Sequence, residues 1–307
     1  MEKGSRPEID IVLLAGPTAS GKSRLALAHA AETGAWVVNA DTMQVYRDLR
    51  VLTARPSPDD ERAAPHRLYG HVDGAVRYSV GAWLADFAGV LAEAREQRRP
   101  LIVVGGTGLY FKALTEGLAA MPAIPAELRA EILAETAGLS APEAHERLRA
   151  IDPEDAAAIR PSDRSRIVRA LEVMRATGRS LAEWQRAARQ EPLLDPAAVR
   201  RFVLVPDRAE LARRIAARTE VMLAGGALPE VAALLARTLP PAFPVMKAIG
   251  VRQIADHVTD RLSPEEAATA INLETRHYAK RQMTWFRNQM SDWPPLEAKL
   301  DLLRLPA

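Results

Sequence analysis

Residues 16–23 have the sequence of a phosphate-binding loop. They are Gly16, Pro17, Thr18, Ala19, Ser20, Gly21, Lys22 and Ser23, and they directly follow the apolar run Ile11–Ala15. The backbone N–H groups of such a loop, at the start of a helix, converge on phosphate oxygens. Lys22 adds a positive charge, and the Ser23 hydroxyl is placed for Mg²⁺. We therefore expect these residues to bind a diphosphate or triphosphate with Mg²⁺. A nucleotide is the default ligand for such a loop.

Asp41 is the second candidate, because it follows the apolar run Trp36–Ala40. The competing run, Leu101–Val104, leads into glycines and Thr107 without any acid. Open α/β sheets bind their ligands at the carboxyl ends of the strands. Asp41 could therefore hold Mg²⁺ or act as a general base, and a helix N-cap is its structural alternative. Thr107 would add a hydroxyl at the same rim.

Arg218 opens the segment that ends at Gly225-Gly226. A single arginine is usually a surface group. An enzyme with a phosphate-binding loop nevertheless needs further positive charge where a leaving diphosphate develops, and Arg218 is our candidate for that charge.

Basic side chains are concentrated in two zones. Residues 160–218 carry 14 arginines against 7 acids, a net of +7, and residues 274–287 carry four basic groups against one acid, a net of +3. Arg166 and Arg169 share one helix face in the first zone, and Lys280 and Arg287 lie among aromatic residues in the second. This pattern suits a phosphate backbone with unstacked bases. A solvated surface for the arginines, and core packing for the aromatics, are the alternatives.

The order of elements predicts an α/β fold with a helical insertion. Strand-like runs occur at 9–15, 36–40, 101–104 and 202–205, with helical periodicity between the first three. This alternation implies a parallel sheet covered by helices. Helix-start signals at Ser140, Asp152 and Ser162-Asp163 replace the strands over 119–200. We expect a core of residues 1–118 and 201–307, interrupted by an all-helical insertion of residues 119–200.

Composition restricts the environment of the chain. With 307 residues, of which 48% are hydrophobic, the protein can bury a large core. No apolar run approaches the roughly 20 residues of a membrane span, and the polar segment Met1–Pro7 is not a signal peptide. The sequence contains no cysteine, which excludes disulfides and thiolate chemistry. We expect a cytoplasmic monomer that does not contact membranes.

Together these segments resemble the tRNA dimethylallyltransferases, bacterial form, over nearly the whole chain. Further blocks of the family pattern accompany the phosphate-binding loop, in the family's order. They are Asp41–Tyr46, Leu52–Pro56, Ala64–Leu68, Gly105–Tyr110, Arg166–Val173, Ala248–Arg252 and Tyr278–Arg287. One such block could arise by chance, but the ordered set could not.

The resemblance implies a P-loop NTPase-like core whose loop binds dimethylallyl diphosphate rather than ATP. The partner would be the anticodon stem-loop of tRNA, with the target adenosine flipped into a channel. Asp41 would be the general base, Thr107 its helper, and Arg218, Lys22 and Mg²⁺-bound Ser23 would stabilise the departing diphosphate. The residues implied to face tRNA are Asp41, Thr42, Met43, Gln44, Ser165, Arg166, Arg169, Lys247, Arg252, Lys280, Arg281, Gln282, Trp285 and Arg287.

Some positions depart from the family pattern. Leu52 replaces a usual glycine, so the local turn should differ, and Val251 replaces a frequent tyrosine. Two other functions stay open at this point. One is an adenine-nucleotide prenyltransferase of the cytokinin type, which would not need the helical insertion or the basic zones. The other is an ATP-dependent RNA-binding switch, which leaves the missing acid after Val104 unexplained.

Overall fold

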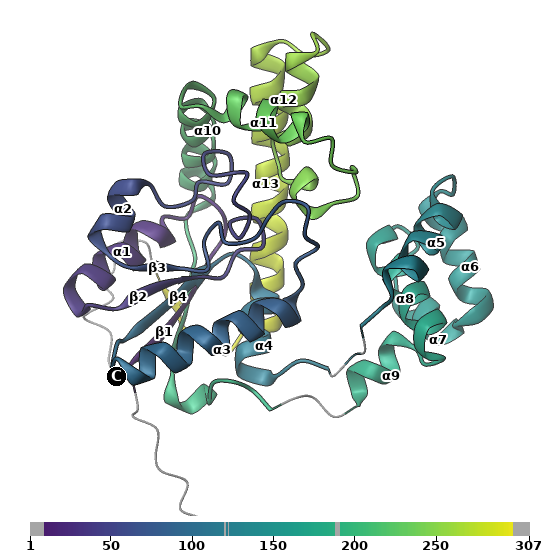
Figure 1. The fold of residues 1–307 in the computed structure, drawn as a ribbon, viewed down its shortest axis with the longest axis horizontal. Helices are drawn as coiled ribbons and strands as arrows, with labels where there is room; N and C mark the ends of the chain where they lie inside the picture. The colour runs from purple at the N-terminus through teal and green to yellow at the C-terminus, as the bar shows by residue number, and fades with distance from the viewer. Residues whose placement is uncertain (1–8, 120, 122, 188–190, 297–307) are drawn as a thin grey trace, which may run out of the picture. The chain divides into compact units, whose positions relative to one another are not determined.

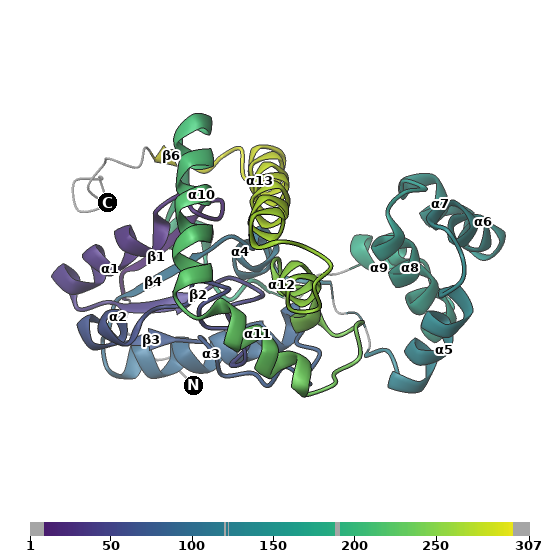
Figure 2. The ribbon, with the colours of Figure 1, turned by 90° about the horizontal axis from the view of Figure 1, so that it is seen from above.

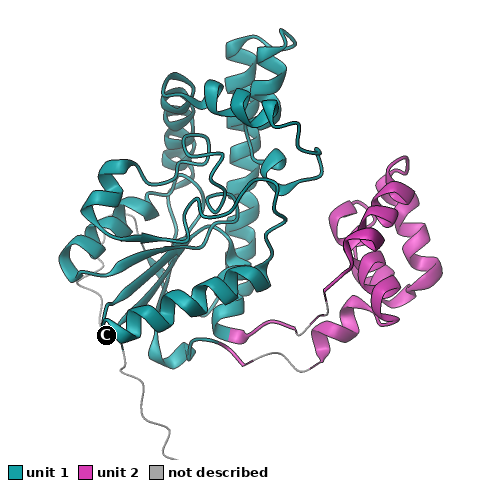
Figure 3. Cartoon of the chain, viewed as in Figure 1, with its two compact units in different colours: residues 1–115, 193–307 teal, residues 116–192 magenta. Residues whose placement is uncertain are grey.

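The computed structural model describes residues 9–119, 121, 123–187 and 191–296 of the 307-residue chain. These residues form two compact units, coloured separately in Figure 3. The first consists of Met1–Thr115 together with Leu193–Ala307, and the second is Glu116–Pro192. The first contains the phosphate-binding loop, and each unit is described by itself below.

A six-stranded parallel sheet forms the centre of the first unit (Figure 1). The strand order is β3-β2-β4-β1-β5-β6, and every pairing is parallel. The strands are β1 (Ile11–Ala15), β2 (Trp36–Asn39), β3 (His66–Arg67), β4 (Leu101–Gly105), β5 (Arg200–Leu204) and β6 (Pro295–Leu296). The α/β fold and its four predicted strands are confirmed. The two-residue strands β3 and β6 were not predicted, because so short a run carries no periodicity.

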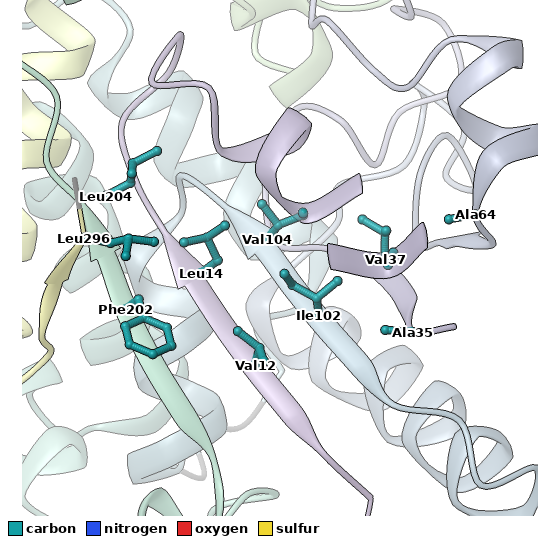
Figure 4. Packing of buried hydrophobic residues seen from close by; sticks show 12 residues of the cluster. Val12, Leu14, Ala35, Val37, Ala64, Ile102, Val104, Phe202, Leu204 and Leu296 are labelled. Atoms are coloured by element: carbon teal, nitrogen blue, oxygen red, sulfur yellow. The ribbon is translucent and has the colours of Figure 1, made fainter. Parts of the chain in front are cut away.

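Alternate residues of the strands build one buried layer of this sheet. Val12 and Leu14 of β1 lie beside Ile102 and Val104 of β4 in one apolar cluster (Figure 4). Successive strand side chains point to opposite faces, so these residues share a face. Buried Ala26 and Ala30 belong to the same cluster, and the helix that carries them therefore covers this face. Burial on both faces explains why the strands are apolar throughout.

Helices cover both sides of the sheet, with α1 and α3 on opposite faces in Figure 2. Before the second unit the helices are α1 (Lys22–Thr33), α2 (Pro58–Ala63), α3 (Val80–Glu96) and α4 (Gly108–Glu116). After it they are η1 (Pro196–Ala198), α10 (Arg208–Ala224), α11 (Ala227–Ala236), η2 (Pro244–Lys247), α12 (Val251–Val258) and α13 (Pro264–Gln289). Buried Leu211 and Ile215 of α10 pack against Ala279, which holds α10 beside α13.

The second unit contains five helices in its described residues. They are α5 (Ala126–Thr136), α6 (Ala141–Ile151), α7 (Pro153–Ala158), α8 (Arg164–Thr177) and α9 (Leu181–Arg186). The predicted start signals are confirmed, because Ser140, Asp152 and Asp163 are the N-caps of α6, α7 and α8. Each side chain accepts a hydrogen bond from the first helical turn, as an N-cap should.

The second unit ends at Pro192, whereas we expected the insertion to extend to residue 200. Leu194 accounts for the difference, since it is buried and its N–H donates to the Leu114 carbonyl oxygen of the first unit (3.1 Å).

Among the described residues, no single helix is long and apolar enough to cross a membrane. Two helices, α10 and α11, which meet at a bend of 66°, would together have the length and apolar composition of a span.

Candidate active site

The phosphate-binding loop connects β1 to α1 at the carboxyl edge of the sheet. Gly21 has a φ of +93° and precedes the first helical residue, Lys22. Ala19 also has a positive φ, +62°, which is uncommon for a residue with a Cβ. Its side chain packs against the buried cluster of Leu211, Ile215 and Ala279. Packing against α10 and α13 thus compensates for an unfavourable backbone conformation in the loop.

Three side chains from α10 and α13 hold this loop. Arg214 donates to the Ser20 carbonyl oxygen (2.8 Å), and Arg218 donates to the Thr18 hydroxyl (2.8 Å). Gln282 accepts a hydrogen bond from the Thr18 N–H (2.9 Å). The loop sequence therefore supplies the cradle, and helices more than 190 residues later in the chain fix its shape.

Asp41 lies in a turn directly after β2 and is held by buried Asn39. The Asn39 side chain accepts from the Asp41 N–H (2.9 Å) and donates to the Asp41 carbonyl oxygen (3.0 Å). Oδ1 of Asp41 accepts from the N–H groups of Met43 (2.8 Å) and Gln44 (3.4 Å). These contacts resemble an N-cap, yet the residues that follow form turns rather than a helix. They orient the carboxylate, so Oδ2 is the oxygen placed to accept a proton.

Thr107 meets the Asp41 turn from the neighbouring strand. Its hydroxyl accepts from the Thr42 N–H (3.1 Å), and its own N–H donates to the Ala40 carbonyl oxygen (3.1 Å). Because β4 lies between β1 and β2 in the sheet, the Thr107 turn also lies beside the phosphate-binding loop. The structure thus brings the predicted base and its predicted helper together at the edge that holds the loop.

A cavity of about 270 Å³ opens at this edge. Its polar and charged lining includes Thr18, Asp41, Arg218, Lys247 and Arg281. Its apolar lining comes mainly from Met43, Leu52, Met222, Ala248, Ile249 and Ile271. A ligand with a phosphorylated end and an apolar body fits such a lining, because the cations neutralise the phosphate while the apolar residues exclude water.

Glu230 of α11 shapes one wall of this cavity. Its carboxylate accepts hydrogen bonds from three consecutive N–H groups, those of Arg50, Val51 (2.9 Å) and Leu52 (2.8 Å). The Leu52 side chain is buried against Gly250, a contact that a glycine at position 52 could not make. A Cβ on Gly250, whose φ is +102°, would lie 2.5 Å from Leu52 Cδ1. Sequence reasoning missed Glu230, since no local pattern links α11 to residues 50–52.

Burial controls the ionisation of several groups around Asp41. It lowers the pKa of Lys22 to about 8, an effect that Asp41 opposes and Arg218 reinforces. Burial also lowers the pKa of Arg218, again opposed by Asp41. The pKa values of Tyr69, Tyr110 and Tyr278 are raised by burial and by the charge of Asp41. The tyrosines therefore stay neutral, and Lys22 and Arg218 are cations on which the charge of Asp41 acts.

We expect the affinity for a prenyl diphosphate to fall as the pH rises above about 8. Lys22 is protonated below its lowered pKa of about 8 and loses its charge above it. Isothermal titration calorimetry between about pH 7 and about pH 9.5 measures the effect, a range in which the donor phosphates keep their charge. Lys22→Arg should remove the pH step, because arginine stays protonated throughout. An affinity independent of pH in the wild type would contradict this assignment.

Apart from Asp41, Gln282 and Trp285, the predicted RNA-facing residues of the first unit separate into three groups. Thr42, Met43, Lys247 and Arg281 line the cavity. Arg252, Lys280 and Arg287 are exposed on α12 and α13. The Gln44 side chain donates to the carbonyl oxygens of Thr53 (2.9 Å) and Ala54 (3.0 Å). These bonds stabilise the turn that follows Leu52 in the cavity wall.

Gln282 and Trp285 both make internal contacts, and their RNA-facing role stays a prediction. Gln282 is only 5% exposed, and both ends of its amide are hydrogen-bonded within the protein. The Trp285 ring lies against Gly108, where a Cβ would approach it to 2.0 Å. The family resemblance, rather than helical periodicity, implied that both residues face tRNA. Their contacts with Thr18, Gly106 and Gly108 depend on how α13 packs against the edge of the sheet.

Ser165, Arg166 and Arg169 lie on α8, in the second unit. Ser165 and Arg166 are exposed, and Arg166 pairs with Asp163 (3.5 Å). Arg169 donates to the buried carboxylate of Glu172 (3.2 Å), which also pairs with Arg129 (3.3 Å). Arg129 was not among the predicted residues, but the shared carboxylate makes it part of the same basic cluster.

No group of three or more His, Asp or Glu side chains that could hold a metal occurs within the described ranges. Mg²⁺ usually binds through one or two protein oxygens, together with substrate phosphates and water. The Ser23 hydroxyl, at the start of α1, is a donor of this kind, and Asp41, whose charge acts on the adjacent Lys22, is a second. The residues present therefore fit a Mg²⁺ ion that arrives with a diphosphate.

Glu274 and Tyr278 also line the cavity, although neither was in the predicted site. Glu274 accepts a hydrogen bond from Gln253, whose Oε1 accepts from the Gly250 N–H (3.1 Å). A sequence signal for these residues existed. Positions 271, 274, 278 and 282 recur at intervals of three and four along one face of a helix, and two of them are the apolar Ile271 and the aromatic Tyr278.

Comparisons with known proteins agree with this geometry. A family model described as IPP transferase matches residues 44–289, and one described as isopentenyl transferase matches residues 9–78. A tRNA dimethylallyltransferase of Nitrobacter hamburgensis is 53% identical, covering 95% of this chain and 93% of the relative. Another, of Methylobacterium nodulans, is 54% identical and covers 95% and 97%.

Two solved structures are also similar. A tRNA isopentenylpyrophosphate transferase of Bacillus halodurans has a TM-score of 0.67 at 28% identity, covering 97% of this chain and 93% of its own. A eukaryotic dimethylallyltransferase captured acting on tRNA has a TM-score of 0.77 at 25% identity and covers 97% and 75%. The chain belongs to the IPP transferase family, the family of the tRNA dimethylallyltransferases.

Proposed function

We propose that this protein transfers the dimethylallyl group of dimethylallyl diphosphate to the exocyclic amine of an adenosine in tRNA, releasing diphosphate. The acceptor would be the adenosine on the 3′ side of the anticodon, presented by the anticodon stem-loop. One observation carries the proposal: Asp41 and Thr107 meet at the sheet edge where the phosphate-binding loop and Arg218 converge. An acceptor amine at Asp41 would therefore lie beside a donor whose diphosphate rests in the loop.

In the reaction, the bond between the allylic carbon and the diphosphate oxygen breaks, and a bond from that carbon to the adenosine nitrogen forms. The nitrogen loses a proton, which Oδ2 of Asp41 accepts as general base. Negative charge grows on the departing diphosphate, where Lys22 and Arg218 supply preorganised positive charge. The apolar lining excludes water, which would otherwise capture the allylic carbon.

Mg²⁺ is part of the proposal. Ser23 is the side chain that would hold the ion against the diphosphate. Asp41 is near the same site, because its negative charge raises the pKa values of Lys22 and Arg218 against the effect of burial. When bound, the ion would neutralise part of the diphosphate charge.

The competing function is prenylation of a free adenine nucleotide. The isopentenyl transferase model matches the first part of the chain, so the donor side alone does not separate the two functions. A separate helical unit with the Arg166 and Arg169 cluster favours tRNA, since a free nucleotide needs no such surface.

The test offers unmodified tRNA and AMP in parallel with dimethylallyl diphosphate and Mg²⁺. Mass spectrometry should find one added five-carbon unit on an adenosine of the tRNA and none on AMP. No mass gain with the right tRNA would refute the proposal, and a gain on AMP alone would favour the competing function. Because the proposed acceptor is tRNA, we also propose that the protein acts in the cytoplasm, and its monomeric state stays a prediction.

A further inference from the structure

Gln282 occupies a central position in the first unit that the proposed reaction does not yet use. It is buried in α13, and its amide joins two loops that arise far away in the sequence. Oε1 accepts from the Thr18 N–H of the phosphate-binding loop (2.9 Å), and Nε2 donates to the Gly106 carbonyl oxygen beside Thr107 (2.9 Å). One side chain thus spans the donor and acceptor sides of the site.

We propose that Gln282 is a positioning residue that fixes the diphosphate cradle relative to the Thr107 turn, rather than a contact with RNA. The inference rests on the proposed function, because it takes the loop as the diphosphate site and the Thr107 turn as the acceptor side. What it adds is that the two hydrogen bonds of the Gln282 amide hold the phosphate-binding loop and the Thr107 turn in a fixed relative position.

The glycines of the turn show how closely α13 approaches it. A Cβ on Gly106 would lie 2.1 Å from Gln282 Nε2, and one on Gly108 would lie 2.0 Å from the Trp285 ring. Real Cβ atoms do not make contacts this short. The Gln282 amide therefore rests directly on the backbone of the turn, and the packed Trp285 ring beside it restricts any other placement of the helix.

On the donor side, Gln282 determines which way Thr18 points. The Thr18 N–H is committed to Gln282, and its hydroxyl accepts from Arg218 (2.8 Å). Thr18 is thereby held from α13 and α10 at once. Loss of the Gln282 bond would free this part of the loop and weaken the alignment of Arg218 with a bound diphosphate.

On the acceptor side, the bond to Gly106 supports the residue that meets the Asp41 turn. The Thr107 hydroxyl accepts from the Thr42 N–H, next to Asp41. Transfer requires the donor carbon and the acceptor nitrogen to approach in line, and a displacement of about 1 Å can cost about 100-fold in rate. Gln282 limits that displacement, because it holds both sides to the same rigid helix.

The test compares two perturbations of this link with one control. Gln282→Met removes both hydrogen bonds at similar side-chain length, and Gly106→Ala displaces the amide without changing residue 282. Gln289→Met is the matched control, because Gln289 is an exposed glutamine of the same helix whose amide accepts a hydrogen bond from Lys112 (2.6 Å) and contacts neither loop of the site in the described residues. For each protein we would measure the Kd for inorganic diphosphate with Mg²⁺, the Kd for tRNA alone, and the single-turnover rate of prenyl transfer.

We expect Gln282→Met and Gly106→Ala to raise the diphosphate Kd by about 10-fold and to lower the transfer rate by about 10- to 100-fold. The tRNA Kd should stay within about 2-fold, and Gln289→Met should match the wild type. A weakened tRNA affinity with unchanged diphosphate affinity would overturn the inference and make Gln282 an RNA contact. Unchanged values throughout would overturn it as well. A wild type that binds no diphosphate would instead refute the proposed function.

Discussion

Asp41→Asn is expected to lower the single-turnover rate of prenyl transfer by about 10²- to 10⁴-fold, the usual contribution of a general base. Asparagine keeps an oxygen at the Oδ1 position, so the hydrogen bonds from Met43 and Gln44 can persist. It cannot accept the proton of the adenosine amine at neutral pH. A radiolabelled donor and saturating tRNA would measure the rate without interference from product release.

Asp59→Asn, which changes an exposed carboxylate of α2, is the control for this experiment and should retain full activity. The alternative for Asp41 is a purely metal-binding role. In that case the variant would keep its transfer rate at saturating Mg²⁺, and only the Mg²⁺ concentration required would rise. Such a result would remove Asp41 from the proposed proton transfer.

Arg218→Gln is expected to lower the transfer rate by about 10²- to 10³-fold, the scale on which a preorganised charge stabilises a transition state. Arg218 lines the cavity and donates to Thr18, while its Nε is buried without a hydrogen-bond partner in the described structure. A buried donor left without a partner is costly, and a diphosphate oxygen would satisfy it. Burial lowers the Arg218 pKa, but an arginine stays protonated at neutral pH.

The measurement should separate the chemical step from donor binding, because charge on the leaving group is greatest as the allylic bond breaks. The single-turnover rate should therefore fall more than the Kd for dimethylallyl diphosphate rises. Arg213→Gln, on the same helix but exposed and paired with Glu210, is the matched control. An equal loss in both variants would show that Arg218 acts only through the general charge of α10.

The sequence alone determined the features whose physics is local. A glycine-rich loop between an apolar run and a helix predicts a phosphate-binding site, because its N–H groups and Lys22 follow from the order of residues. The N-caps Ser140, Asp152 and Asp163 likewise begin their helices through contacts within one turn. The four predicted strands were long enough to be recognised as buried and parallel. The family resemblance likewise rested on short local blocks, among them the phosphate-binding loop and Asp41–Tyr46.

Tertiary structure alone decided which side chains act at a distance. Gln282 contacts a residue 264 positions earlier, and Glu230 holds the Leu52 N–H from 178 positions away. Neither contact leaves a local pattern, since the register between two distant helices and loops is set by how the whole core packs. The same reason explains why the contact of the Trp285 ring with Gly108 could not be predicted from the sequence. The sequence determined the phosphate-binding loop and the fold class, and packing decided which helices hold that loop to the acceptor side.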